Sequence, residues 1–114
     1  MFYLPTIYSI PAPSEGPPNL QSSHEGSKSS LVVKWDTIPS HSRNGILKGY
    51  HIYYKKESSA GPSMDMTVGA SVKQILIKDL EAYTAYYIDV CSFTIAGDGV
   101  CSNVTQMTRS LGKR

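Results

Sequence analysis

Two cysteines, Cys91 and Cys101, are the residues whose type and spacing most directly suggest chemistry in this sequence. A cysteine pair can form a disulfide, remain as two reduced thiols, or take part in a metal or redox site. Their spacing is neither that of a CxxC motif nor that of a zinc ligand pair, and two thiols alone do not complete a zinc site. The choice therefore depends on the elements that carry the two thiols.

The other reactive side chains form no recognisable catalytic or metal-binding motif. His24, His41 and His51 fall in a predicted turn, in a predicted loop and on an outward strand position, without a cysteine or carboxylate at ligand spacing. No serine lies in a Gly-x-Ser-x-Gly elbow, and Asp79 and Glu81 lie in a turn, where solvation explains them. The sequence predicts no catalysis by this chain, no cofactor and no metal.

The elements that position these residues are predicted to be β-strands. Apolar and polar residues alternate with a period of two, and turn-forming residues separate the runs at intervals of about 8 to 12 residues. The predicted strands are 19–21, 31–35, 50–55, 64–68, 74–80, 85–93 and 102–108. This pattern predicts an all-β fold, a seven-stranded antiparallel β-sandwich of the immunoglobulin-like kind.

The predicted strand 85–93 places Tyr86, Ile88 and Val90 inward and Cys91 outward. A hairpin centred near Ala96 would set Cys91 opposite Cys101, at the Cα separation of about 4.5–5.5 Å that a disulfide tolerates. We therefore favour a disulfide, and reduced structural thiols remain the alternative.

The last strand has two alternative registers. Either Val104 and Gln106 or Thr105 and Met107 face the core, and we favour the second pair. Asn103 begins the sequon Asn103-Val104-Thr105 and is predicted to carry an N-linked glycan if it faces solvent. The disulfide and the sequon together predict an extracellular location.

Composition narrows the range of partners. The net charge is only +2 and charged residues make up 18% of the chain, so no surface for nucleic acid is predicted. No apolar run approaches the roughly 18 residues that cross a bilayer, so no direct membrane contact is predicted.

Residues 1–16, rich in proline, are predicted to be a linker or the tail of a preceding module. Residues 17–109 are the predicted domain, and 110–114 a C-terminal linker.

Five short motifs occur in an order and spacing typical of one family. They are PPNLQ, SLVVKW with Trp35, NGILKGYHIYY with Tyr50, LEAYTAY with Leu80 and Tyr86, and AGDGVCS. The chain therefore resembles a fibronectin type III domain. The resemblance implies that Trp35, Tyr50, Leu80 and Tyr86 belong to the core, with Tyr86 in a tyrosine corner. Ala82 stands where the family often has proline, which should loosen the loop before Tyr86.

The hairpin glycines and the outward residues complete the predictions. Gly97 and Gly99 are expected to adopt positive φ angles in a hairpin with a bulge.

Outward tyrosines are common in strands, but an apolar strip or an exposed loop end is also a candidate contact surface. The predicted partner contacts are Tyr53, Tyr87 and Phe93 on the sheet and His41, Arg43 and Ile95 in the loops.

The resemblance implies a non-catalytic, extracellular protein-interaction module of a multi-domain cell-surface receptor or adhesion protein. Its partners would be another cell-surface or matrix protein, including a second copy of itself, and neighbouring modules of the same chain. The parent chain could still carry a catalytic domain elsewhere, as in receptor tyrosine phosphatases. The alternatives are a passive spacer, a cytokine-receptor ligand-binding domain, which the missing Trp-Ser-x-Trp-Ser motif disfavours, and an intracellular module if the thiols are reduced.

Overall fold

The computed structural model describes residues 12–24 and 29–108, so most of the predicted N-terminal linker and all of the C-terminal one lie outside the described residues. Within these described residues, seven strands and one short 3-10 helix, η1 (Ser40–Ser42), are formed. The strands are β1 (Gln21–Ser23), β2 (Leu31–Lys34), β3 (Gly49–Lys56), β4 (Met64–Gly69), β5 (Gln74–Ile77), β6 (Ala85–Thr94) and β7 (Gly97–Met107).

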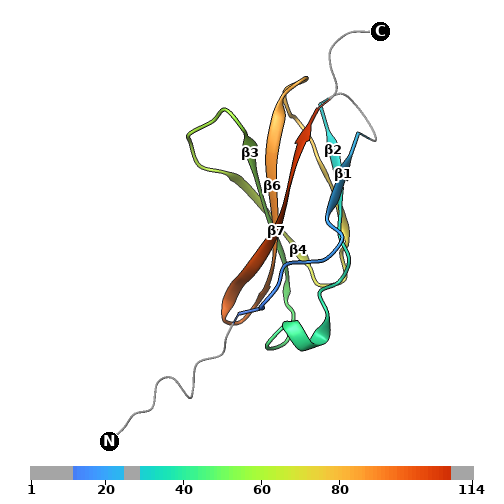
Figure 1. Cartoon of the computed structure of the whole chain (residues 1–114), viewed down its shortest axis with the longest axis vertical. Helices are drawn as coiled ribbons and strands as arrows, with labels where there is room; N and C mark the ends of the chain where they lie inside the picture. The colour runs from blue at the N-terminus through green and yellow to red at the C-terminus, as the bar shows by residue number, and fades with distance from the viewer. Residues whose placement is uncertain (1–11, 25–28, 109–114) are drawn as a thin grey trace, which may run out of the picture.

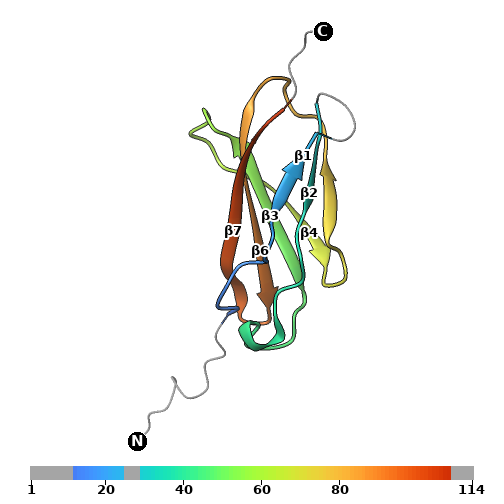
Figure 2. The ribbon, with the colours of Figure 1, turned by 45° about the vertical axis from the view of Figure 1, so that its right-hand side comes forward.

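The strands form two antiparallel sheets that face each other (Figures 1 and 2). One sheet has the order β1-β2-β5 and the other has the order β4-β3-β6-β7. The predicted seven-stranded antiparallel sandwich is therefore confirmed. The first strand begins two residues later than predicted, because Asn19 has a φ of +56°, which an extended strand does not allow.

The core lies between the two sheets and follows the predicted alternation. Tyr50 and Ile52 of β3 and Ile88 and Val90 of β6 are fully buried. The side of the other sheet contributes further buried residues, namely Leu31 and Val33 of β2, Ile77 of β5, and Trp35. The rings of Trp35 and Tyr50 pack with centroids 5.3 Å apart and planes tilted by 59°, a favourable aromatic geometry.

A tyrosine corner holds the loop before β6. The ring of Tyr86 is buried, and its hydroxyl oxygen accepts a hydrogen bond from the backbone N–H of Glu81 at 2.9 Å. Thr108, after the end of β7, donates to the carbonyl of Glu81 at 2.6 Å and accepts from the N–H of Thr84 at 2.9 Å. The loop that lacks the family's proline is thus held by side-chain hydrogen bonds.

The hairpin between β6 and β7 contains the predicted bulge, but the prediction for one glycine is wrong. Gly97 has a φ of +108°, whereas Gly99 does not have a positive φ. A Cβ on Gly99 would instead clash with the carbonyl oxygen of Pro13. Gly99 is thus required for the close approach of the N-terminal segment and not for its own dihedral angles.

The favoured register of the last strand is also wrong. Val104 packs against the core, while Thr105 and Met107 are exposed. Gln106 faces inward at the rim of the sandwich, where its Nε2 lies in a hydrogen bond 3.0 Å from Nε2 of His24. The inward amide of Gln106 also donates to the carbonyl of Met107 at 3.2 Å, so its nitrogen has polar neighbours at the rim.

Residues 12–17 lie along the edge of β7, although the sequence assigns most of them to a linker. The carbonyl of Pro13 accepts a hydrogen bond from the N–H of Val100 at 3.2 Å, and that of Pro17 accepts one from Ser102 at 2.6 Å. At the end of the sandwich, the N–H of Ser14 donates to the carbonyl of Ser42 at 2.8 Å. We call residues 12–17 the N-terminal strap, and we propose that the folded unit begins with it.

Candidate interaction surface

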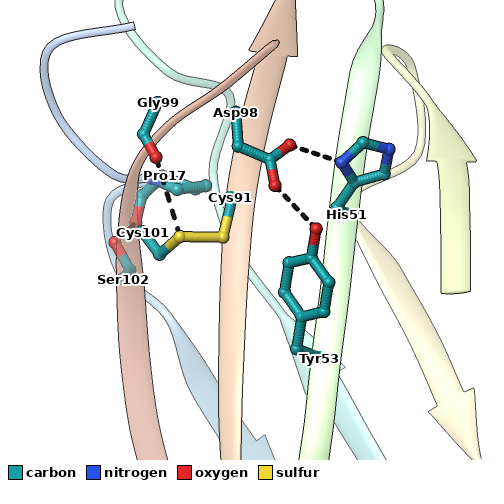
Figure 3. Close-up of a disulfide and its surroundings, with 8 residues drawn as sticks. All are labelled: Pro17, His51, Tyr53, Cys91, Asp98, Gly99, Cys101 and Ser102. Atoms are coloured by element: carbon teal, nitrogen blue, oxygen red, sulfur yellow. Dashed lines mark hydrogen bonds and ion pairs between the residues drawn. A yellow bond between two sulfur atoms is a disulfide. The ribbon is translucent and has the colours of Figure 1, made fainter. Parts of the chain in front are cut away.

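The two cysteines form a cross-strand disulfide (Figure 3). Cys91 on β6 pairs directly with Cys101 on β7, and their Cα atoms are 4.1 Å apart. Cys91 lies on the outward face of the sheet, yet it is fully buried between its neighbours on β3 and β7. The predicted disulfide is therefore confirmed, and it acts as a structural cross-link with no thiol available for catalysis.

Beside the disulfide, three side chains from β3 and β7 form a hydrogen-bonded cluster on the outward face. Asp98 accepts a hydrogen bond from the hydroxyl of Tyr53 at 2.6 Å and pairs through its other oxygen with Nδ1 of His51 (Figure 3). The imidazole of His51 stacks on the ring of Phe93, with centroids 4.0 Å apart. Tyr53 and Phe93, both predicted partner contacts, are thus only partly exposed and already engaged with neighbours.

The hydrogen bond to Asp98, with smaller contributions from burial and nearby carboxylates, raises the pKa of Tyr53 from 10.0 to about 12. The folded chain therefore holds this proton more tightly than the unfolded chain does. The resulting stabilisation should be complete below about pH 10 and should disappear as the pH rises through about 12.

Replacing Tyr53 by phenylalanine should reduce the loss of stability between pH 9 and pH 12, because residue 53 can no longer ionise. Urea unfolding at both pH values would measure the loss for wild type and variant. Tyr83→Phe, at a residue with 65% exposure, is the control and should behave like wild type. Equal losses for wild type and Tyr53→Phe would contradict the assignment.

Further along the same face, a groove of about 320 Å³ lies between Tyr53 and Tyr87. Lys55, Ser63, Asp89, Asn103, Val104 and Thr105 complete its lining. Burial raises the pKa of Asp89 above its ordinary value. Tyr87 is 42% exposed and Asn103 is exposed, so this part of the predicted strip is accessible.

A second accessible surface lies at the end of the sandwich where the β6–β7 hairpin meets the loop before β3 (Figure 1). Ile95 is 77% exposed and Ile46 is 85% exposed. With Gly45 and Lys48 they line a depression of about 390 Å³, and we call these four residues the end patch. The backbone hydrogen bond from the N–H of Lys48 to the carbonyl of Phe93, 2.9 Å long, ties the two sides together.

The two other predicted loop contacts are placed differently. The His41 side chain is 80% exposed and lies 3.9 Å from the carboxylate of Glu15 in the N-terminal strap. Nε of Arg43 donates to the carbonyl of Ile38 at 3.1 Å, so this side chain braces its own loop. Ile46 was not among the predicted contacts, and its position directly after the Asn44-Gly45 turn is the signal that could have identified it.

The described residues contain neither a metal-binding cluster nor a membrane-spanning helix. Within residues 12–24 and 29–108, no group of three or more His, Cys, Asp or Glu residues could hold a metal ion. The helix in this part of the chain, η1, has three residues and is too short to cross a bilayer. The groove and the end patch both include predicted partner contacts, Tyr53 and Tyr87 in the groove and Ile95 in the end patch.

Sequence comparisons identify relatives with 32–36% identity. Mouse protein sidekick-2 is 36% identical over 100 residues, which cover 87% of this chain and 4% of that protein. Chicken protein sidekick-1 is 32% identical over 91% of this chain and 5% of its own length. Human cell adhesion molecule DSCAM is 34% identical over 79% of this chain and 4% of its own length. The chain thus spans about a twentieth of these relatives.

Solved structures agree with this result. The FN1–FN3 domains of chicken CNTN1 superpose with a TM-score of 0.75 and 27% identity, covering 87% of this chain and 33% of that one. The third fibronectin III domain of human KIAA0343 protein has a TM-score of 0.79 at 24% identity, covering 93% and 90%, and shows the shared fold. The family model for the fibronectin type III domain matches residues 11–108. The chain therefore belongs to the fibronectin type III family.

Proposed function

We propose that this chain is a non-catalytic, extracellular protein-interaction module of a cell-adhesion or cell-surface receptor protein. The observation that carries the proposal is the end patch, where Ile46 and Ile95 are both largely exposed beside Lys48. Two neighbouring apolar side chains on exposed loops are better explained as a contact for another protein than as a surface that only water covers. The likeness to human DSCAM, named a cell adhesion molecule, supports the same role.

The disulfide supports the extracellular part of the proposal. Disulfides persist in oxidising compartments, and Cys91 and Cys101 are the only cysteines of the chain. The chain secreted from eukaryotic cells behind a signal peptide should therefore gain the mass of two hydrogens on reduction. Two free thiols in the secreted protein would contradict this location.

Replacing both Ile46 and Ile95 by serine should weaken partner binding by at least about tenfold, because two apolar anchors that the partner would bury are lost. The probes are purified ectodomains of cell-surface proteins together with a second copy of this chain, each tested against the immobilised module. Leu76→Ser on β5 is the matched control, because Leu76 is 46% exposed on the opposite sheet.

The outcomes separate an interaction module from a passive spacer. Binding that the double variant loses and the Leu76→Ser control keeps would support the proposal. Absence of binding to every probe would favour a spacer that sets the distance between other modules. Binding that survives the double substitution would move the contact away from the end patch.

A further inference from the structure

The sequon of this chain lies in the wall of the groove between Tyr53 and Tyr87. Asn103 and Thr105, the two residues that define the sequon, both line the groove and are exposed. Val104 between them packs against the core, so β7 presents the two sequon residues on the same outward face. The strand register that contradicts the sequence-based prediction is the one that exposes Asn103.

Cross-strand pairing places Asn103, on the edge strand β7, at one end of a polar and aromatic row. Asp89 on β6 pairs directly with Asn103 on β7, and it also pairs with Tyr53 on β3. The next pair on the same face joins Tyr87 to Thr105. Tyr53 therefore lies beyond Asp89 as seen from Asn103, and Tyr87 lies diagonally across from Asn103 on β6. The rest of the lining adds hydroxyl, ammonium and carboxylate groups.

This combination suits a carbohydrate. A sugar ring has an apolar face of C–H groups, which packs on aromatic rings, and a rim of hydroxyls, which need hydrogen-bond partners. Lys55, Ser63 and Asp89 supply donors and acceptors in the groove, and its volume of about 320 Å³ is near the lower end for small-ligand sites. A glycan attached to Asn103 would begin inside the groove and pay little additional ordering entropy.

We propose that Asn103 carries an N-linked glycan whose first sugar residues lie in the groove between Tyr53 and Tyr87. The inference rests on the extracellular location proposed above. The donor is a lipid-diphosphate-linked oligosaccharide of the secretory pathway. Its C1–O bond to the diphosphate breaks, a bond forms from C1 to Nδ2 of Asn103, and Nδ2 loses one proton, so no oxidant or reductant is required.

The glycan has a consequence for partner recognition. It covers the part of the outward face that Tyr53, Tyr87 and Asp89 would otherwise present to a protein. Protein contacts are then directed to the end patch, which lies at the hairpin end of β6 and β7 and shares no lining residue with the groove.

The test uses the whole chain secreted from eukaryotic cells behind a signal peptide. The variants are Thr105→Ala, which removes the sequon, and Thr105→Ser, which keeps it at the same position. Intact mass before and after peptide N-glycosidase treatment measures occupancy. Acetylation of tyrosines by N-acetylimidazole, followed by peptide mapping, measures the accessibility of Tyr87 against the exposed Tyr83 outside the groove.

The wild type and Thr105→Ser should carry a glycan on Asn103, and Thr105→Ala should not. Acetylation of Tyr87 should be at least threefold slower in the glycosylated protein than after enzymatic deglycosylation or in Thr105→Ala, while Tyr83 reacts at the same rate in all. A secreted, disulfide-bonded protein with a bare Asn103 would overturn this inference and leave the extracellular proposal intact. A glycan that leaves Tyr87 equally reactive would overturn its placement in the groove.

Discussion

Replacing Trp35 by alanine should lower the free energy of unfolding by about 3–5 kcal/mol, the cost of deleting a large buried aromatic side chain. Trp35 is only 2% exposed and packs on the ring of Tyr50 across the sandwich. Alanine would remove this contact and leave a cavity that two hydrogen-bonded sheets cannot close easily. Urea unfolding followed by circular dichroism would measure the change, because the chain has no second tryptophan for fluorescence.

Trp35→Phe is the matched control for this substitution. The indole N–H of Trp35 is buried without a hydrogen-bond partner among the described residues, so phenylalanine removes an unsatisfied donor and keeps an aromatic ring. We expect Trp35→Phe to lower the free energy of unfolding by about 1–2 kcal/mol. An alanine variant no less stable than the phenylalanine variant would show that the ring is not central to the core.

Replacing both Cys91 and Cys101 by alanine should lower the free energy of unfolding by about 2–3 kcal/mol, because the unfolded chain regains the freedom of the closed loop. The separation of ten residues makes this loop short. The two sheets should still form, since the core between them contains neither sulfur. Urea unfolding of the variant, with circular dichroism of its native state, would measure both effects.

Chemical reduction of the wild type separates the cross-link from packing. Cys91 is fully buried, so alanine also removes apolar contacts, whereas reduction leaves both sulfur atoms in place. Similar losses for the reduced wild type and the variant would assign the effect to the cross-link. Unchanged stability after verified reduction would be the contrary result.

The strands, the core and the disulfide follow from local patterns and could be predicted from sequence. Alternation identified β3 and β6, and the pairing of Cys91 with Cys101 follows from the hairpin between them. The same pairing also determines which residues of the last strand face outward. Since Cys101 shares the outward face of Cys91, Asn103, Thr105 and Met107 must face outward too. The predicted register, with Thr105 and Met107 inward, is the opposite of this one.

The remaining errors involve contacts between distant residues. Gln106 is tolerated inward because His24, from the start of the domain, lies within hydrogen-bond distance. Gly99 has no side chain because Pro13 approaches its backbone, which no hairpin rule contains. The end patch is similar, since Ile46 and Ile95 come from two loops that only the fold brings together. Each of these features depends on tertiary structure and not on a local period.

The N-terminal strap and the disulfide determine how this domain would respond to tension. The described chain begins at the hairpin end of β6 and β7 and ends at the opposite end, so tension applied to its two ends would pull along the strands (Figure 1). Such tension would act in shear on the hydrogen bonds that join the strap to Val100 and Ser102 on β7. If the sandwich opened, the disulfide would keep the residues between Cys91 and Cys101 closed and shorten the extended chain by about 30 Å.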